Sequence, residues 1–299
     1  MSPVSWEPHT VVTDEVVEHA PVAALAALLD DGLAAPGVGD ELPPLWHWVA
    51  LARWPVSAEI GVDGHPRRGS FLPPIDLPRR MFAGGSAGFH AGITVGSTVR
   101  RESRVTSVEE KSGRSGNLVL VKIRTRLFNE DGACAVDETQ DLVFREGGAA
   151  GDDAATPDSA SGLTPAGSPL HRHAAWEWEL ATDPTLLMRF SAATSNPHRI
   201  HYDWPYATRV EGYPGLVVHG PLMTLALAEL VRLEEHPQPV THIHHRVLRP
   251  LYCGQRASLV RTDSQESGGM TLSAVGPDWT EGAEPRPNAT VTVDSSTRQ

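Results

Sequence analysis

A stretch almost free of large apolar side chains divides this chain and limits the folds that it can adopt. Residues 147–169 read GGAAGDDAATPDSASGLTPAGSP, a composition typical of a flexible linker. On each side of it, helical or irregular material comes first and a run of strand-like segments follows. We therefore predict a first domain over residues 1–146, a linker over 147–169 and a second domain over 170–299.

Both halves contain short segments with the composition and turn boundaries of antiparallel strands. In the first half these are residues 86–93, 97–109, 117–128 and 133–145, with hairpin turns at 111–116 and 129–132. In the second half they are a strand through Trp176 and Trp178, then 239–249, 255–262, 270–275 and 289–293. We predict one helix per half, at 13–33 and from Gly220 onward, and an ordered loop at 59–85. This order predicts an α+β fold, because a doubly wound sheet has a helix after every strand.

Composition and charge exclude several classes of function. The formal net charge is -12, with 37 acidic and 25 basic residues, so a nucleic-acid partner is not expected. Two cysteines are too few for a disulfide scaffold or a cysteine-rich zinc site. The N-terminus lacks a secretory signal pattern, and the apolar stretch at 20–33 is too short to span a bilayer. We therefore expect a cytoplasmic protein with no membrane partner.

The segment 189–229 concentrates side chains that can carry chemistry. Asn196, His198, Arg199 and His201 fall within six positions of one another. A helical turn there would place His198 and His201 on the same face, because residues three apart are neighbours on a helix. An imidazole exchanges protons near physiological pH, which suits general acid and base catalysis.

A second feature of this segment is the helix that we predict to begin at Gly220. Leucines and alanines follow at helical spacing, which indicates a buried helix. The free N–H groups of its first turn, led by Gly220, form a natural site for negative charge. The His219-Gly220 pair could equally be a simple helix start.

These residues resemble the hydratase 2, or MaoC-like, branch of the hot-dog fold, which includes (R)-specific enoyl-CoA hydratases and hydroxyacyl-thioester dehydratases. The family pattern [S/T]-G-D-x-N-P-[L/I]-H falls on residues 194–201, and FSAATSNPHRIHYD at 190–203 is the form similar to mesaconyl-CoA and itaconyl-CoA hydratases. Residues 63–81 and 111–116 resemble the N-terminal dehydratase domain found beside this motif in such enzymes. The resemblance places the family's catalytic histidine on His201, its catalytic aspartate on Asn196 and its thioester-binding glycine on Gly220.

The resemblance implies a double hot-dog protein, in which two antiparallel sheets each wrap a helix. It also implies a hydro-lyase that reversibly hydrates an α,β-unsaturated acyl-CoA, such as mesaconyl- or itaconyl-CoA, or another acyl group carried by CoA or an acyl carrier protein. No metal or redox cofactor is implied, and CoA enters as part of the substrate. Two alternatives remain: a hot-dog thioesterase, and an acyl-thioester binding protein without catalysis.

Asn196 departs from the family pattern, because an amide neither gains nor loses a proton at ordinary pH. Our hypothesis is that His201 carries the proton transfers through a bound water. Asn196 would hold that water, and His198 would assist His201 or fix its position. Asn196 could also be a helix N-cap, a position that asparagine favours.

Candidate substrate-binding residues include several cations in this otherwise acidic chain. Arg79, Arg80 and Arg114 are the best candidates for a carboxylate or for coenzyme phosphates, because a guanidinium pairs with both in a bidentate way. Near the motif the candidates are Arg199, Tyr202 and His219, with pairing to Asp203 as the alternative for Arg199.

We expect no metal site and some self-association. The histidines of residues 242–245 alternate along a predicted strand, which puts His242 and His244 on one face and His245 on the other. That arrangement lacks a third ligand at metal-binding spacing. Exposed sheet edges favour a homo-oligomer.

Overall fold

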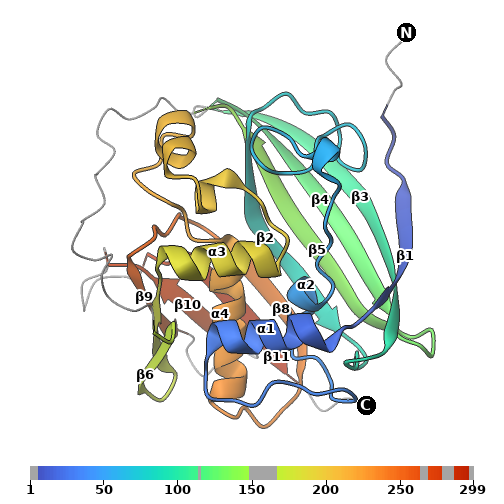
Figure 1. Ribbon diagram of the computed structural model, residues 1–299, viewed down its shortest axis with the longest axis vertical. Helices are drawn as coiled ribbons and strands as arrows, with labels where there is room; N and C mark the ends of the chain where they lie inside the picture. Colours follow the sequence, from blue (N-terminus) through green and yellow to red (C-terminus); the bar gives the residue numbers. More distant parts are fainter. Residues whose placement is uncertain (1–5, 114–115, 148–166, 263–268, 278–285, 296–299) are drawn as a thin grey trace.

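A computed structural model describes residues 6–113, 116–147, 167–262, 269–277 and 286–295. In this part of the chain eleven strands form one antiparallel sheet in the order β1-β3-β4-β5-β2-β8-β11-β10-β9-β7-β6 (Figure 1). The strands are β1 Thr10–Val16, β2 Arg79–Phe89, β3 Thr98–Gly113, β4 Gly116–Phe128, β5 Cys134–Arg145, β6 Leu170–Ala174, β7 Glu177–Ala181, β8 Val240–Val247, β9 Arg256–Arg261, β10 Met270–Val275 and β11 Ala289–Ser295. The helices are α1 His19–Leu29, α2 His47–Ala50, α3 Pro184–Ala193 and α4 Gly220–Leu233, with short helical turns η1 Ser57–Glu59, η3 Arg199–His201 and η4 Tyr206–Val210.

The first half, β1 to β5, and the second half, β6 to β11, repeat one strand order. In the first half the order is β1-β3-β4-β5-β2, and in the second half it is β7-β9-β10-β11-β8. In each row of five, the strand that is second in chain order (β2 or β8) lies at the end of the row and pairs with the strand that is fifth (β5 or β11). The halves join through these second strands, since residues 84–88 of β2 pair antiparallel with residues 246–242 of β8. The predicted α+β class is confirmed.

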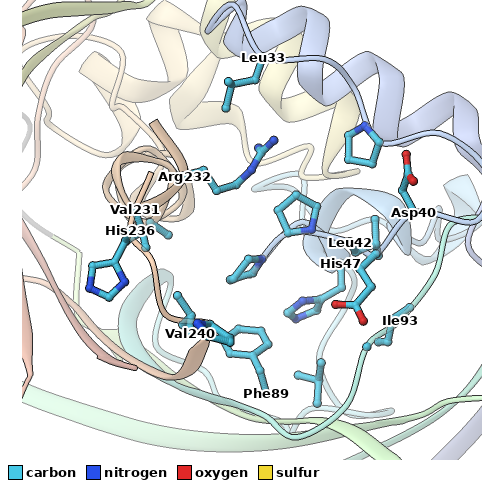
Figure 2. A pocket seen from close by; sticks show the side chains of 18 of the residues that line it. Leu33, Asp40, Leu42, His47, Phe89, Ile93, Val231, Arg232, His236 and Val240 are labelled. Carbon is cyan, nitrogen blue, oxygen red and sulfur yellow. The ribbon is translucent and has the colours of Figure 1, made fainter. Parts of the chain in front are cut away.

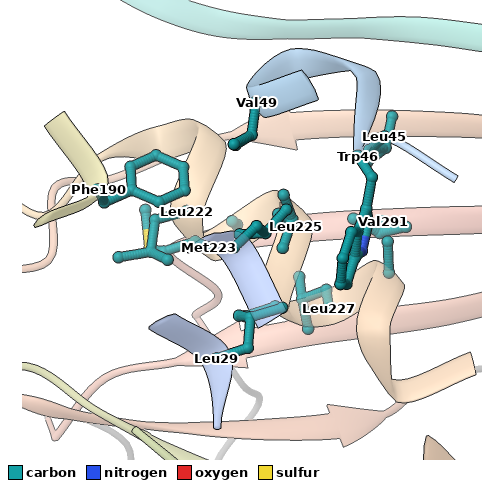
Figure 3. Packing of buried hydrophobic residues seen from close by; sticks show 14 of the residues in the cluster. Leu29, Leu45, Trp46, Val49, Phe190, Leu222, Met223, Leu225, Leu227 and Val291 are labelled. Carbon is teal, nitrogen blue, oxygen red and sulfur yellow. The ribbon is translucent and has the colours of Figure 1, made fainter. Parts of the chain in front are cut away.

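Helix α4 lies against β8, β10 and β11 and also reaches β2 of the first half. A helix that is apolar around most of its circumference must be buried, and residues 222–231 of α4 are all buried. Figure 3 shows Leu222, Met223 and Leu225 of α4 packed among side chains from both halves, including Trp46 and Phe190. One apolar core therefore holds the two halves together.

The predicted helix at 13–33 is wrong in its first part. Residues 10–16 form the edge strand β1, paired with β3, and the helix covers only His19–Leu29. The burial of β1 alternates residue by residue, so its period is that of a strand and not of a helix. In the second half, the single strand predicted through Trp176 and Trp178 is a hairpin of β6 and β7, with Trp176 at its turn.

The predicted loop at 59–85 is also wrong at its end, because β2 begins at Arg79. The glycines that suggested a loop are needed for close packing of strands. A Cβ on Gly84 would lie 2.3 Å from the carbonyl oxygen of His245, and one on Gly85 would lie 1.9 Å from that of Thr139. A glycine inside a strand thus marks a close backbone approach here. Residues 148–166, most of the predicted linker, lie outside the described residues, so the domain boundaries stay a prediction.

Candidate active site

A cavity of about 740 Å³ opens where β2 of the first half meets α4 and β8 of the second half. Its lining includes six of the site residues expected from the sequence: Arg79, Arg80, Asn196, His198, His201 and Gly220. Arg199, Tyr202 and His219 do not line it, and Arg114 lies outside the described residues. Residues far apart in the chain therefore meet in one cavity built by both halves.

The motif turn between α3 and η3 positions the histidines. Asp183 caps α3 by accepting a hydrogen bond from the Leu186 N–H at 2.8 Å. After α3, the Asn196 N–H donates to the Ser191 carbonyl at 2.9 Å, and the Asn196 side-chain oxygen accepts from the His198 N–H at 3.3 Å. The N-cap position of η3 belongs to His198, so Asn196 stabilises the turn from two residues before the cap.

His201 is held as a neutral imidazole with one free nitrogen. Its Nδ1 donates to the Val217 carbonyl at 2.7 Å, which leaves the lone pair of Nε2 free. Burial, followed by the positive charge of His198, lowers the pKa of His201 to about 3, although the Val217 carbonyl works in the opposite direction. At neutral pH the ring is therefore uncharged, and the lone pair of Nε2 can accept a hydrogen bond.

His219 lies behind His201 and not on the cavity wall. Its ring stacks on that of His201 with 3.6 Å between centroids, and its Nε2 shares a hydrogen bond of 2.8 Å with the Ser191 hydroxyl. Burial is the main reason why the pKa of His219 falls well below its usual value. The structure thus gives this predicted substrate-binding residue a different place, as the support of the His201 ring.

Arg199 and Tyr202 are also engaged within the protein. The Arg199 guanidinium donates twice to Asp203 Oδ2, at 2.9 and 2.7 Å, and once to the Val62 carbonyl at 3.0 Å. The Tyr202 hydroxyl donates to the Pro197 carbonyl at 3.0 Å. The alternative prediction for Arg199, pairing with Asp203, is confirmed.

Gly220 begins α4 and lines the cavity. Among the described residues its backbone N–H has no hydrogen-bond partner, as expected for the first turn of a helix. A donor at this place can hold the negative oxygen that develops on a thioester carbonyl. There is little room for a side chain, because a Cβ on Gly220 would lie 2.9 Å from Val247 Cγ2 and 3.2 Å from Phe82 Cδ1.

We predict that Gly220→Ala lowers kcat by about 10- to 100-fold, somewhat less than the loss of a whole oxyanion donor. The added methyl group must push against Val247 and Phe82, which shifts the N–H and narrows the cavity. Steady-state kinetics measure the effect. Gly37→Ala is the control, because its new Cβ would make only an ordinary contact at 3.5 Å. An unchanged kcat in Gly220→Ala would remove this amide from the catalytic set.

The two predicted arginines of β2 differ in their partners. Arg79 Nε lies 3.2 Å from Glu211 Oε2, and its guanidinium lies over the ring of Tyr213. Arg80 has neither an ion pair nor a hydrogen bond with the described residues. Burial lowers the pKa of Arg80 to about 10, so it remains charged at neutral pH. The cavity wall therefore carries a cation that has no direct ion pair with the described residues, although the negative charge of Asp63 acts on it from further away.

The first half contributes groups that the sequence analysis did not identify. His65, from the loop before β2, lines the cavity and lies with its ring 4.2 Å from the ring of His198. Asp63 accepts a hydrogen bond from His65 Nδ1 at 3.1 Å. These residues belong to the segment that resembles a dehydratase domain, but no spacing in the sequence connects them to His198.

A second cavity of about 600 Å³ lies on the other side of His47 (Figure 2). Figure 2 shows apolar side chains such as Leu42 and Val240 around it, together with Asp40 and Arg232. Of the predicted site residues, those in the described part of the chain do not line this cavity. The candidate active site is therefore the cavity that contains His201.

The fold and the site together define a hot-dog hydro-lyase that acts on acyl thioesters, as predicted. The sequence model of the hydroxyacyl-thioester dehydratase type 2 family matches residues 45–253, and this chain belongs to that family. The mesaconyl-C(4)-CoA hydratase of Chloroflexus aurantiacus is 38% identical over 278 residues, which cover 92% of this chain and 93% of the relative. The mitochondrial hydroxyacyl-thioester dehydratase type 2 of Schizosaccharomyces pombe is 24% identical, covering 82% of this chain and 87% of the relative.

Solved structures confirm the predicted double hot-dog fold. HtdX of Mycobacterium tuberculosis has a TM-score of 0.62 at 19% identity, covering 96% of this chain and all of that one. A second Mycobacterium tuberculosis protein, described as a double hotdog fold, has a TM-score of 0.53 at 16% identity, with 97% of this chain and 95% of that chain covered. None of the described helices has the length and apolar character needed to cross a membrane.

Proposed function

We propose that this protein reversibly hydrates a short, branched dicarboxylic enoyl-CoA such as mesaconyl- or itaconyl-CoA. The observation that carries the proposal is the unpaired cation Arg80 in the same cavity as His201 and Gly220. A carboxylate on the acyl group supplies the direct ion-pair partner that Arg80 lacks among the described residues. The similarity to the mesaconyl-C(4)-CoA hydratase supports the same class of acyl group.

The proposed reaction uses the geometry of the cavity directly. The thioester carbonyl accepts a hydrogen bond from the Gly220 N–H, and His201 Nε2 removes a proton from water as the water oxygen bonds to the β-carbon. The electrons of the double bond move toward the carbonyl, and the α-carbon then receives a proton. Asn196 orients the water by hydrogen bonding and transfers no proton.

Addition of water is redox-neutral, so we propose no redox cofactor. We propose no metal either, because His201 and Gly220 are assigned the tasks of activating water and stabilising the thioester oxygen. CoA, or an acyl carrier protein, enters as the carrier of the acyl group. We also propose a cytoplasmic enzyme that self-associates. Strands β1 and β6 are the free edges of the described sheet, and such edges can pair with a second copy.

The experiment that tests the function follows the absorbance of the conjugated thioester with mesaconyl-CoA, itaconyl-CoA and crotonyl-CoA. Loss of absorbance without release of free thiol supports hydration. Release of thiol would make the protein a thioesterase. Ligand binding without either change would make it a binding protein.

We predict that Arg80→Gln lowers kcat/KM for mesaconyl-CoA about 10- to 100-fold more than for crotonyl-CoA. This corresponds to the loss of one charge-assisted hydrogen bond, worth about 1.5 to 3 kcal/mol. Arg67→Gln is the control, because Arg67 is an exposed arginine in the loop before β2 that does not line the cavity. An equal loss with both substrates would place Arg80 against the shared CoA part instead.

A further inference from the structure

The proposed reaction needs a second proton-transfer group, because the aspartate of the family pattern is Asn196 in this chain. We propose that His198 is this group, and that Asp63 and His65 of the first half position it and stabilise its charged form. The inference rests on the proposed hydration and assigns roles to residues of the other half of the molecule.

Asp63 and His65 form a fixed carboxylate–imidazole pair. Asp63 Oδ2 accepts from His65 Nδ1 at 3.1 Å, and Asp63 Oδ1 accepts from the His65 backbone N–H at 3.0 Å. Burial opposes the charged form of Asp63, but the hydrogen bonds that His65 donates, together with the electrostatic effect of the His65 and His198 rings, outweigh it. Together they lower the pKa of Asp63 to about 2. A negative charge therefore stands beside the two rings.

His198 lies between this pair and a second carboxylate. Its side chain is buried, and its Nε2 lies 3.9 Å from Glu211 Oε1 and has no hydrogen-bond partner among the residues that the structure describes. A buried polar atom without a partner requires an explanation, and a proton shared with Glu211 during turnover provides one. In the described part of the chain, His201 has no carboxylate within ion-pair distance. Two histidines whose rings are 5.5 Å apart thus have opposite surroundings, as expected for an acid and a base.

The first-half loop is locked onto the catalytic turn. The Asp63 carbonyl accepts from the Arg199 N–H at 3.0 Å, and the Val62 carbonyl accepts from the Arg199 guanidinium at 3.0 Å. A Cβ on Gly64, whose φ is +93°, would lie 1.8 Å from the Pro197 carbonyl oxygen, so only glycine allows this approach. Contacts of the residues just before His65 with Pro197 and Arg199, the two neighbours of His198 in the chain, therefore hold the His65 ring against His198.

The proton balance of the reaction follows from these two environments. In hydration, neutral His201 takes a proton from water while the C–O bond forms, and charged His198 gives a proton to the α-carbon. The proton on His201 then returns to His198 through solvent, which restores both groups. Dehydration runs through the same steps in reverse, with His198 as the base.

The same cluster also has the composition of a cation site. One ligand atom from each of Asp63, His65 and His198 lies within 4.8 Å of the other two. Burial lowers the pKa of His65 most, and the positive charge of Arg80 is the next largest cause. The same positive charge would repel a cation bound to this cluster. The geometry points to a hydrogen-bonded pair of Asp63 and His65. The test therefore also includes removal and addition of a metal.

The test compares Asp63→Asn and His65→Gln with Asp76→Asn, an exposed acid in the same loop. We expect kcat to fall about 10- to 100-fold in the first two, the usual effect of losing a positioning partner, with KM within about twofold. The alkaline limb of the pH profile should move to lower pH, because the negative charge beside the two rings is lost or no longer held in place. Asp76→Asn should match the wild type.

A double-mutant test separates this role from a purely structural one. In a His198→Gln background, Asp63→Asn should lower kcat less than about twofold further, because both changes remove one function. Independent losses that multiply, an unshifted pH profile, or zinc-dependent recovery of an EDTA-treated enzyme would overturn the proposal. Failure of the wild type to hydrate any enoyl-CoA would instead refute the proposed function. Thermal unfolding curves identify variants that do not fold. If His65→Gln does not fold, His65→Asn is used in its place.

Discussion

Replacing His201 with glutamine should lower kcat for hydration of the thioester by about three orders of magnitude, within the usual range for loss of a general base. Glutamine fills similar space but offers no lone pair of comparable basicity. The binding contacts of the acyl group and of CoA remain, so KM should change by less than about threefold. Initial rates from the absorbance of the conjugated thioester measure both constants.

The control for this prediction is His236→Gln. His236 is a half-buried histidine that lines the second cavity and not the first, so its replacement should leave kcat unchanged. If His201→Gln retained more than about one tenth of the wild-type kcat, general base catalysis at His201 would be refuted. The proposed role of Val217 and His219 in supporting the His201 ring for catalysis would then be refuted as well.

The free energy of unfolding should decrease by several kcal/mol as the pH is lowered from 6.5 toward 4. Burial lowers the pKa of His201 to about 3 and that of His245 to about 4, both well below the usual 6.5. The unfolded chain therefore binds more protons than the folded chain in this window. The stability contributed by each neutral histidine is complete above pH 6.5 and declines by about 1.4 kcal/mol per pH unit below it, until the folded pKa is reached. His219 and His65 add to the same slope.

Denaturant unfolding at pH 7.5, 6.5, 5.5 and 4.5 would measure this slope. His245→Leu is the informative variant, because both of its ring nitrogens are buried without a partner and its ring stacks on Phe82. This variant should have a slope shallower by about 1.4 kcal/mol per pH unit. The exposed His171→Gln variant should behave as the wild type. Equal stability at pH 7.5 and 5.5 would show that these histidines accept protons without unfolding.

Local parts of the fold and site could be predicted from the sequence. The turn at 194–201 brings His198 and His201 together because they are three residues apart, and Gly220 starts α4 as the apolar spacing indicated. Arg199 reaches Asp203 because the two are four residues apart. The Gly-rich start of β2 was misread, because the sequence does not show which backbone approaches a glycine.

The sequence alone determined the repeated run of strands, the buried helix α4 and the motif that carries His201, because these depend on spacing over a few residues. Tertiary structure decided which groups share the cavity. His65 and His198 are 133 positions apart, yet the pairing of β2 with β8 and the close contact at Gly64 bring their rings within 4.2 Å. Burial in the assembled core likewise decided that His201 is neutral, because desolvation depends on every neighbour in space.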